Sequence, residues 1–298
     1  MHSTNSAFLR RREILLGVAT SLMAGKAFAT GAPRIAAIDW AMLETAVALG
    51  VMPVAATELI QFRKDAVAPE IPGDVIDLGL RGSPNFELLH LLKPDLILLS
   101  PFYTRHQITL ERIAPIVSFP FYTRGEPPFE KAVVAVSGLA ERLDRRDEAS
   151  MILSGIEVQL EGYRRTLSPF ANRPIYLVNV GDARHVRVFG SDSMFGDVLS
   201  RIGLQNAWTE RSRYTFAAPV PIEQLAARED ARIIVISDIP IEARSSLKRS
   251  MIWNSLVPVR ERRVLMLDNI NRYGGVIAAM RFARLLSDAL LGSDGAKR

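Results

Sequence analysis

An arginine and a tyrosine, Arg81 and Tyr103, stand just after two strand-like segments of this chain. Arg81 lies between two glycines after the segment 75–78, and Tyr103 follows the continuous apolar run 96–99. Open α/β sheets hold their ligands beyond the carboxyl ends of their strands, and we expect these two strands to be neighbours in one sheet. A guanidinium offers several fixed donors, and a phenol adds one directed hydrogen bond. The two residues therefore predict binding of an anionic, oxygen-rich ligand.

Strands and helices alternate from residue 34 to about residue 120, which predicts a mainly parallel sheet with helices on its faces. The expected strands are 34–38, 52–55, 75–78, 96–99 and 116–119, and the expected helices are 41–49 and 86–92. Two longer helices follow, over 129–143 and from 146 to about 167. At 1.5 Å per residue the second is ~33 Å long, which is enough to join two lobes.

The strand–helix pattern returns in the last third of the chain. We expect strands over 175–180, 233–237 and 264–267, and helices over 195–202, 222–227 and 274–291. The predicted fold is α/β, with two Rossmann-like lobes joined by one long α-helix and a ligand cleft between the lobes. The predicted boundaries are 30–145 for the N-terminal lobe, 146–168 for the interlobe helix and 169–298 for the C-terminal lobe.

The composition excludes several classes of protein. The chain has 298 residues, of which 48% are hydrophobic and none is cysteine, so disulfides, thiolate metal sites and cysteine nucleophiles are excluded. The net charge is +5, but the first 29 residues supply +3 and leave +2 for the rest. No basic block remains that would indicate nucleic acid as a partner. His90, His106 and His185 share no ligand spacing, so we expect no metal site of the protein's own.

Residues 1–29 have the features of a secretory signal peptide. Three arginines precede the apolar run 14–23, and alanines at positions 27 and 29 predict a mature chain that starts at Thr30. The segment RREIL at 11–15 resembles a twin-arginine export signal, and an ordinary secretion signal is the alternative. An apolar run of about ten residues is too short for a membrane anchor, which needs ~20. We therefore expect a periplasmic protein.

Motifs spread over the chain after residue 29 carry a family resemblance. They are Ile38-Asp39-Trp40, Gly-Leu-Arg at 79–81, Lys93-Pro94, RIAP at 112–115, Asp182-x-Arg184-His185, Val188-Phe189-Gly190, Asn206-Ala207-Trp208 and Tyr273-Gly274. In this order they resemble the periplasmic iron(III)-hydroxamate siderophore-binding proteins (the FhuD family) of ABC import systems. The resemblance implies a protein without enzymatic activity or cofactor, which passes a ferric siderophore to an inner-membrane ABC permease with its ATPase. One cleft suffices for this role, so we expect a monomer.

The resemblance also implies roles for individual residues. Arg81 and Tyr103 match the family's arginine and tyrosine that contact the hydroxamate oxygens. Tyr214, in a second-lobe aromatic segment, and Tyr273, before the last helix, match other ligand-binding positions. Trp40, at the rim after the first strand, either lines the cleft or anchors the following helix.

Two acidic residues are candidates for permease docking. Glu87 and Glu223 start one short helix in each lobe, where the family presents acidic residues to permease arginines. Carboxylates favoured by the helix dipole are the alternative explanation.

Arginines replace much of the aromatic cleft that the resemblance implies. Positions where the family has tryptophans hold Thr215, Asn271 and, in the first lobe, about Asp65. Asn271 is kept as a candidate ligand residue, and the candidate rim arginines are Arg63, Arg105, Arg187, Arg211, Arg213 and Arg272. Each alone is a common surface charge, but together they favour a more anionic ligand than ferrichrome. Our hypothesis is a ferric hydroxamate with extra carboxylates, such as one built on citrate.

Other functions fit the sequence less well. The alternatives among binding proteins are ferric citrate, catecholate siderophores, haem, with Tyr103 as an axial ligand, and cobalamin. An enzyme with two nucleotide-binding lobes is a more distant alternative. The chain contains neither a G-x-G-x-x-G or Walker phosphate loop nor a G-x-S-x-G nucleophile elbow.

Overall fold

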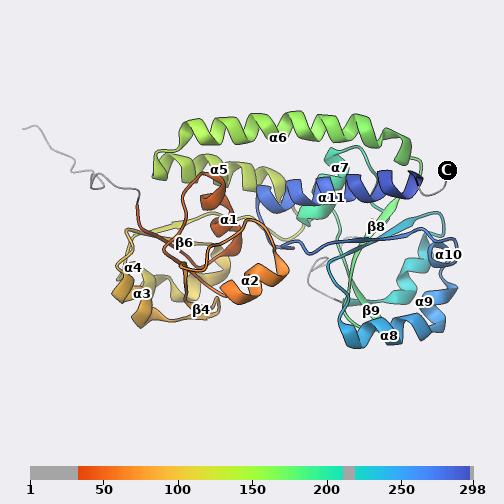
Figure 1. The fold of residues 1–298 in the computed structure, drawn as a ribbon, viewed down its shortest axis with the longest axis horizontal. Coiled ribbons are helices and arrows are strands. Elements are labelled where there is room, and N and C mark those ends of the chain that lie inside the picture. The colour runs from red at the N-terminus through yellow and green to blue at the C-terminus, as the bar shows by residue number, and fades with distance from the viewer. Residues whose placement is uncertain (1–32, 211–218, 296–298) are drawn as a thin grey trace, which may run out of the picture. The chain divides into compact units, whose positions relative to one another are not determined.

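Two five-stranded β-sheets organise the chain, one in each lobe (Figure 1). The computed structural model describes residues 33–210 and 219–295. The strands of the N-terminal sheet are all parallel, in the order β3-β2-β1-β6-β7. Their bounds are β1 (Ile35–Ala37), β2 (Ala55–Ala56), β3 (Ile76–Asp77), β6 (Leu96–Leu99) and β7 (Ile116–Ser118).

Both faces of the N-terminal sheet are buried. Successive side chains of a strand point to opposite faces, so Ala36 and Ile97 enter one apolar cluster whereas Ile35 and Leu98 enter another. Helices cover the two faces, as parallel sheets require. Their bounds are α1 (Trp40–Ala48), α2 (Leu59–Asp65), α3 (Phe86–Leu92), α4 (Gln107–Glu111) and α5 (Phe129–Leu143), with the 3-10 helix η1 (Pro101–His106) before α4.

The strands that precede Arg81 and Tyr103 are not neighbours, so this expectation is wrong. Strands β2 and β1 lie between β3 and β6. The chain after β3 forms a small antiparallel hairpin of β4 (Gly79–Leu80) and β5 (Ser83–Pro84). This hairpin brings Arg81 to Trp40, just beyond the carboxyl end of the central strand β1. Gly79 starts this hairpin with a φ of +77°, a left-handed conformation that glycine adopts at little cost.

The C-terminal sheet is mixed. Strands β8 (Ile175–Val180), β11 (Arg232–Ile236) and β12 (Val264–Leu267) are parallel. Strands β9 (His185–Val188) and β10 (Pro219–Pro221) add an antiparallel ribbon beside β8. The remaining elements are η2 (Ser168–Phe170), α7 (Met194–Arg201), η3 (Ile222–Ala227), α8 (Ile241–Arg249), α9 (Met251–Ser255), α10 (Val257–Arg260) and α11 (Val276–Gly295).

Two helices connect the lobes. The long helix α6 (Arg146–Leu167) lies alongside both α5 and α11 (Figure 1). The sequence places α11 in the C-terminal lobe only, but α11 also packs against α1 and α5 of the N-terminal lobe. The predicted fold of two α/β lobes joined by a long helix is confirmed, and α11 is a second connection.

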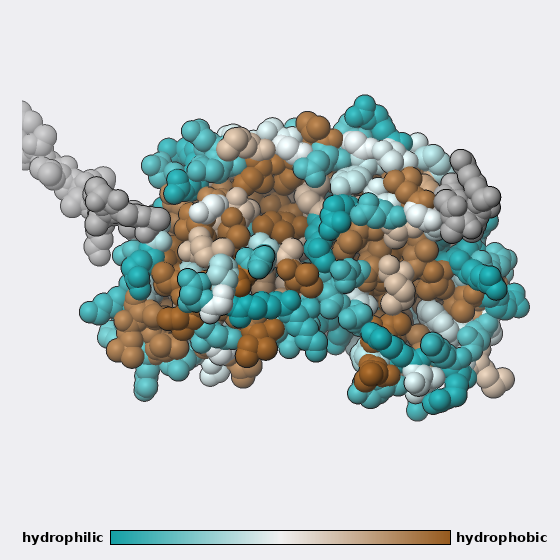
Figure 2. Space-filling model, in the orientation of Figure 1, coloured by the Kyte–Doolittle hydropathy of each residue, from teal (hydrophilic) through white to brown (hydrophobic). Residues whose placement is uncertain are grey.

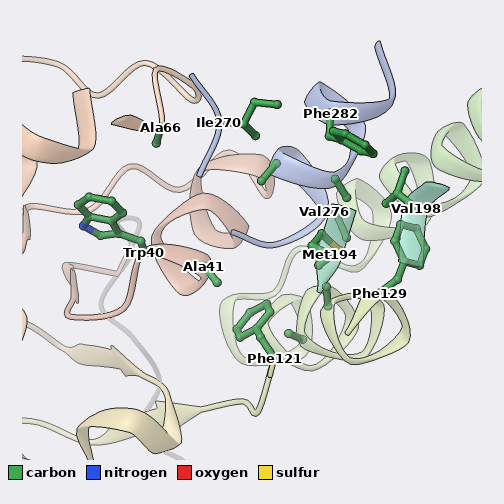
Figure 3. Close-up of a cluster of buried hydrophobic side chains, with 14 of the residues drawn as sticks. Trp40, Ala41, Ala66, Phe121, Phe129, Met194, Val198, Ile270, Val276 and Phe282 are labelled. Carbon is green, nitrogen blue, oxygen red and sulfur yellow. The ribbon is translucent and has the colours of Figure 1, made fainter. Parts of the chain in front are cut away.

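One hydrophobic core runs through both connecting helices and the elements beneath them. Phe129 of the N-terminal lobe lies beside Val198 of α7, and Phe121, Val276 and Phe282 belong to the same cluster (Figure 3). All five side chains are at most 3% exposed. Because the lobes share a core, we expect them to unfold together. Among the described residues, no helix is both long and apolar enough to cross a bilayer.

Candidate functional site

A cavity of about 890 Å³ lies between the lobes. This volume falls within the usual range for ligand pockets, roughly 300–1,000 Å³. The N-terminal lobe contributes Trp40, Gln61, Lys64, Asp65 and Arg81 to its wall. The C-terminal lobe contributes the ends of β8, β9 and β11, the start of α8 and the segment 269–273. The cavity therefore lies at the carboxyl ends of β1 and of two C-terminal strands, as expected for α/β sheets.

Arg81 is held at the cavity wall by two neighbours. Its backbone N–H donates to Oε1 of Glu58 (3.0 Å), and its Nε donates to Oε2 of the same carboxylate (2.7 Å). Its guanidinium lies over the indole of Trp40, 4.0 Å from the ring centroid. This cation–π contact and the ion pair fix the plane of the guanidinium. Nε is committed to Glu58, and the side chain of Arg81 is also hydrogen-bonded to the Tyr103 phenol.

Trp40 is itself fixed, which makes it a rigid platform for Arg81. Its Nε1 donates to the carbonyl of Thr57 (3.0 Å), and its ring meets Phe62 edge to face at 5.1 Å. It begins α1, whose N-cap Asp39 accepts from two backbone N–H groups of that helix. Trp40 is 5% exposed and lines the cavity, so it both anchors α1 and forms part of the wall.

Tyr103 is close to Arg81 but is not among the described residues that line the cavity. It lies in η1, partly buried against the outer apolar cluster of the N-terminal lobe. Burial raises the pKa of its phenol to about 12, and the nearby charge of Arg81 opposes this rise. The phenol therefore keeps its proton at neutral pH and remains a hydrogen-bond donor.

Arg105 stabilises the hairpin that carries Arg81 and does not line the cavity. Its guanidinium donates to the carbonyl of Gly82 and to Nε2 of His106 (3.0 Å). The same His106 nitrogen lies 2.8 Å from the Gly82 carbonyl. Arg105 therefore ties η1 to the turn of the hairpin.

Arg187 faces the cavity from β9. Its strand neighbours Val186 and Val188 are buried in the core of the C-terminal lobe, so Arg187 points to the opposite face. It pairs across the ladder with Asn179 of β8, which also lines the cavity. Asn179 is tied to the sheet through its Nδ2, which donates to the Ile236 carbonyl (2.9 Å).

A buried carboxyl group supports the cavity wall where α11 begins. Glu44 of α1 is fully buried and accepts from Nδ2 of Asn271 (2.7 Å) and from the backbone N–H of Gly275 (2.9 Å). Burial raises the pKa of Glu44 to about 8. The Asn271 Oδ1 accepts from the backbone N–H of Tyr273 (3.1 Å). This network sets the 271–273 turn, and with it the positions of Arg272 and Tyr273, from the opposite lobe.

Tyr273 also contacts the N-terminal lobe. Its ring meets Tyr122 edge to face, with centroids 6.0 Å apart, and the Tyr122 hydroxyl donates to the Gly274 carbonyl (2.7 Å). Both Asn271 and Tyr273 line the cavity. The amide of Asn271 is engaged on both sides, so Asn271 contributes to the wall mainly by orienting its neighbours.

The other candidate residues lie elsewhere. The guanidinium of Arg63 donates to the carbonyls of Ile71 and Pro72 and secures a loop of the N-terminal lobe. Arg211, Arg213 and Tyr214 lie outside the described residues. Glu87 and Glu223 are exposed near the starts of α3 and η3.

Sequence reasoning missed the residues that position the site. Glu58 orients Arg81, and Glu44 orients the 271–273 turn, but no motif marks either residue. Arg244, paired with Asp238 (3.4 Å), forms another unpredicted part of the wall. Within residues 33–210 and 219–295, no group of three or more histidine or acidic residues is placed to hold a metal ion.

The fold and the cavity lead to a family assignment. The family model described as "Periplasmic binding protein" matches residues 35–270. The chain belongs to this family. It is 31% identical to the iron(3+)-hydroxamate-binding protein FhuD of Escherichia coli (strain K12), over 95% of this chain and 97% of that protein. It is 29% identical to the achromobactin-binding periplasmic protein of Dickeya dadantii (strain 3937), over 83% of this chain and 82% of that protein.

A solved structure supports the fold independently. The Fe3+-Desferal-bound siderophore-binding protein FhuD from Vibrio cholerae superposes with a TM-score of 0.82. The match covers 88% of this chain and 98% of that chain at 24% identity. At this identity the match shows that the two proteins share the periplasmic binding protein fold.

Proposed function

We propose that this protein binds a ferric hydroxamate-type siderophore in the interlobe cavity and delivers it to an ABC importer of the inner membrane. It carries its ligand without transforming it. The observation that supports this best is the fixed guanidinium of Arg81 at the cavity wall, held by Glu58 and Trp40. Iron-bound hydroxamate oxygens carry negative charge, and a preoriented arginine gives them several donors at once. The iron enters already chelated.

Tyr103 supports the same ligand class. Its phenol keeps its proton at neutral pH, because burial raises its pKa to about 12. It is therefore available as a donor to hydroxamate oxygens next to Arg81. A phenol that stays neutral also adds no negative charge beside an anionic chelate.

The relatives favour iron–siderophore ligands. The Escherichia coli protein, similar over nearly its whole length, is named for iron(3+)-hydroxamate binding, and the Dickeya dadantii protein for binding achromobactin. We also propose that the mature protein is periplasmic and that residues 1–29 are its export signal, because one relative is named as periplasmic and these residues have the features of a signal peptide.

We propose that the permease docks on exposed residues near Glu87 and Glu223. Hydrophobic residues gather on the surface over α3 and α4 (Figure 2). Leu91, Phe102 and Ile108 of this region are each more than 60% exposed. Contiguous exposed apolar residues beside a charged one are typical of protein interaction sites.

Tryptophan fluorescence tests the proposal, because only one of the three tryptophans lines the cavity. Trp40 lies under Arg81, whereas Trp208 and Trp253 are buried in the core of the C-terminal lobe. The purified protein is titrated with ferrichrome, a ferric catecholate, ferric citrate, haem and cobalamin. We expect saturable quenching at sub-micromolar ferrichrome, and most of it to vanish in the Trp40→Phe variant. Binding of haem or cobalamin without binding of any ferric hydroxamate would contradict the proposal.

A further inference from the structure

Two arginines of the C-terminal lobe face the cavity. Arg187 lines it from β9, and Arg272 lines it from the turn before α11. Neither makes an ion pair with any residue in the described parts of the chain. Other cavity arginines differ in this respect, because Arg81 is paired with Glu58 and Arg244 with Asp238.

The two arginines lie close enough to repel each other. Burial lowers the pKa of Arg272 from its ordinary value, and the positive charge of Arg187 lowers it further. Asp65 and the ring of Tyr273 partly offset this repulsion, and the guanidinium of Arg272 lies 5.7 Å from that ring. Placing two like charges together in a part-buried site costs free energy, which a bound anion recovers.

The backbone around both arginines is set by the fold. Arg187 lies in the antiparallel ladder between β8 and β10, opposite Asn179 and Pro219. Arg272 lies in the turn that Asn271 fixes through its bonds to Glu44 and to the backbone of Tyr273. The sheet and the turn therefore fix the backbone positions from which both arginines face the cavity.

A neutral ligand does not require the positive charge that Arg187 and Arg272 bring to the cavity. Arg81 and Tyr103 already supply donors for the hydroxamate oxygens from the N-terminal lobe. A neutral ferric trihydroxamate brings no net negative charge to Arg187 and Arg272 on the opposite wall. A carboxylate, which arginine binds through two parallel hydrogen bonds, satisfies them.

We propose that Arg187 and Arg272 form a carboxylate-binding subsite, which makes the protein select ferric hydroxamates that carry a free carboxylate over neutral ones. This inference rests on the proposed function. The iron–hydroxamate centre lies against Arg81, and the pendant carboxylate lies across the cavity between the two arginines.

The test compares two chelates and four proteins. Ferrichrome is a neutral ferric trihydroxamate, and ferric aerobactin is a ferric dihydroxamate whose two amino-acid arms carry free carboxylates. Wild type, Arg187→Gln and Arg272→Gln are titrated with each chelate by tryptophan fluorescence. Arg249→Gln is the matched control, because Arg249 is an exposed arginine at the end of α8 that does not line the cavity. Circular dichroism checks that each variant is folded.

We expect wild type to bind ferric aerobactin more tightly than ferrichrome. Each cavity substitution should weaken ferric aerobactin about tenfold or more and change ferrichrome less than about threefold, as expected for the loss of one charge-assisted contact. The control should change neither. Equal weakening of both chelates, or no weakening of ferric aerobactin, would overturn the subsite and leave the proposed function intact. If wild type binds ferrichrome but not ferric aerobactin, the subsite is also overturned. If wild type binds neither chelate, the proposed function itself fails.

Discussion

Glu44 is a buried carboxyl group shared by the two lobes, and its titration makes the stability of the protein depend on pH. It is fully buried, and it accepts hydrogen bonds from Asn271 and from the backbone of Gly275. Desolvation outweighs these bonds and raises the pKa of Glu44 from 4.5 to about 8. In the unfolded chain the same group titrates near its ordinary value.

The sign and size of the effect follow from proton linkage. Between pH 4.5 and about pH 8 the folded protein holds a proton on Glu44 that the unfolded chain has released. The free energy of unfolding is therefore highest below the unfolded pKa and falls as the pH rises through this window. The free energy of unfolding falls by up to ~1.4 kcal/mol for each pH unit, so it falls by about 5 kcal/mol between pH 4.5 and about pH 8.

Urea denaturation of wild type and Glu44→Gln at a series of pH values measures the contribution of Glu44 to the free energy of unfolding. Other groups also titrate, so the informative quantity is the difference between the two proteins. Between about pH 5.5 and about pH 7.5 we expect wild type to lose about 3 kcal/mol relative to the variant. The variant loses one acceptor oxygen, and that cost does not depend on pH. A variant that keeps the pH dependence of wild type would refute the assignment of the titration to Glu44.

The remaining predictions concern the site and its supports. Glu58→Gln should weaken ferrichrome binding about threefold to tenfold, because Arg81 loses the charge that orients it; an unchanged titration midpoint would contradict this. Gly274→Ala should cost about 1–3 kcal/mol in urea denaturation, because the new Cβ would lie 2.5 Å from a carboxylate oxygen of Glu44; equal stability would show that the turn yields. Lysine at both Glu87 and Glu223 should abolish siderophore-dependent growth while ferrichrome binding persists; normal growth would remove their docking role.

Long elements of this fold are predictable from the sequence, whereas short ones are not. The helices 129–143 and 146–167 begin and end where the sequence predicts them, because each has a sustained periodic pattern. The strands β4 and β5 have two residues each, too few to show an alternation. Helix α2 was missed as well, and its N-cap Glu58 has a left-handed φ of 52° and no side-chain cap.

The positions of the site residues can also be predicted from local sequence, whereas the contacts that orient them cannot. Arg81, Trp40 and Tyr273 stand next to strand ends or before the last helix, so local sequence indicates their positions. The contacts that orient them join residues far apart in the chain. Glu58 is 23 residues from Arg81, and Glu44 is 227 residues from Asn271. Such pairs depend on how the sheets and the two connecting helices pack, which no local pattern records.

The most direct test of the account is a calorimetric titration of ferrichrome into wild type and Arg81→Ala. Arg81 is the residue around which the N-terminal wall of the cavity is built, through Glu58 and Trp40. We predict sub-micromolar binding to wild type and a loss of about tenfold to a hundredfold in the variant, the value of one or two charge-assisted hydrogen bonds. No heat of binding with wild type, or the same affinity in both proteins, would contradict a siderophore site at Arg81.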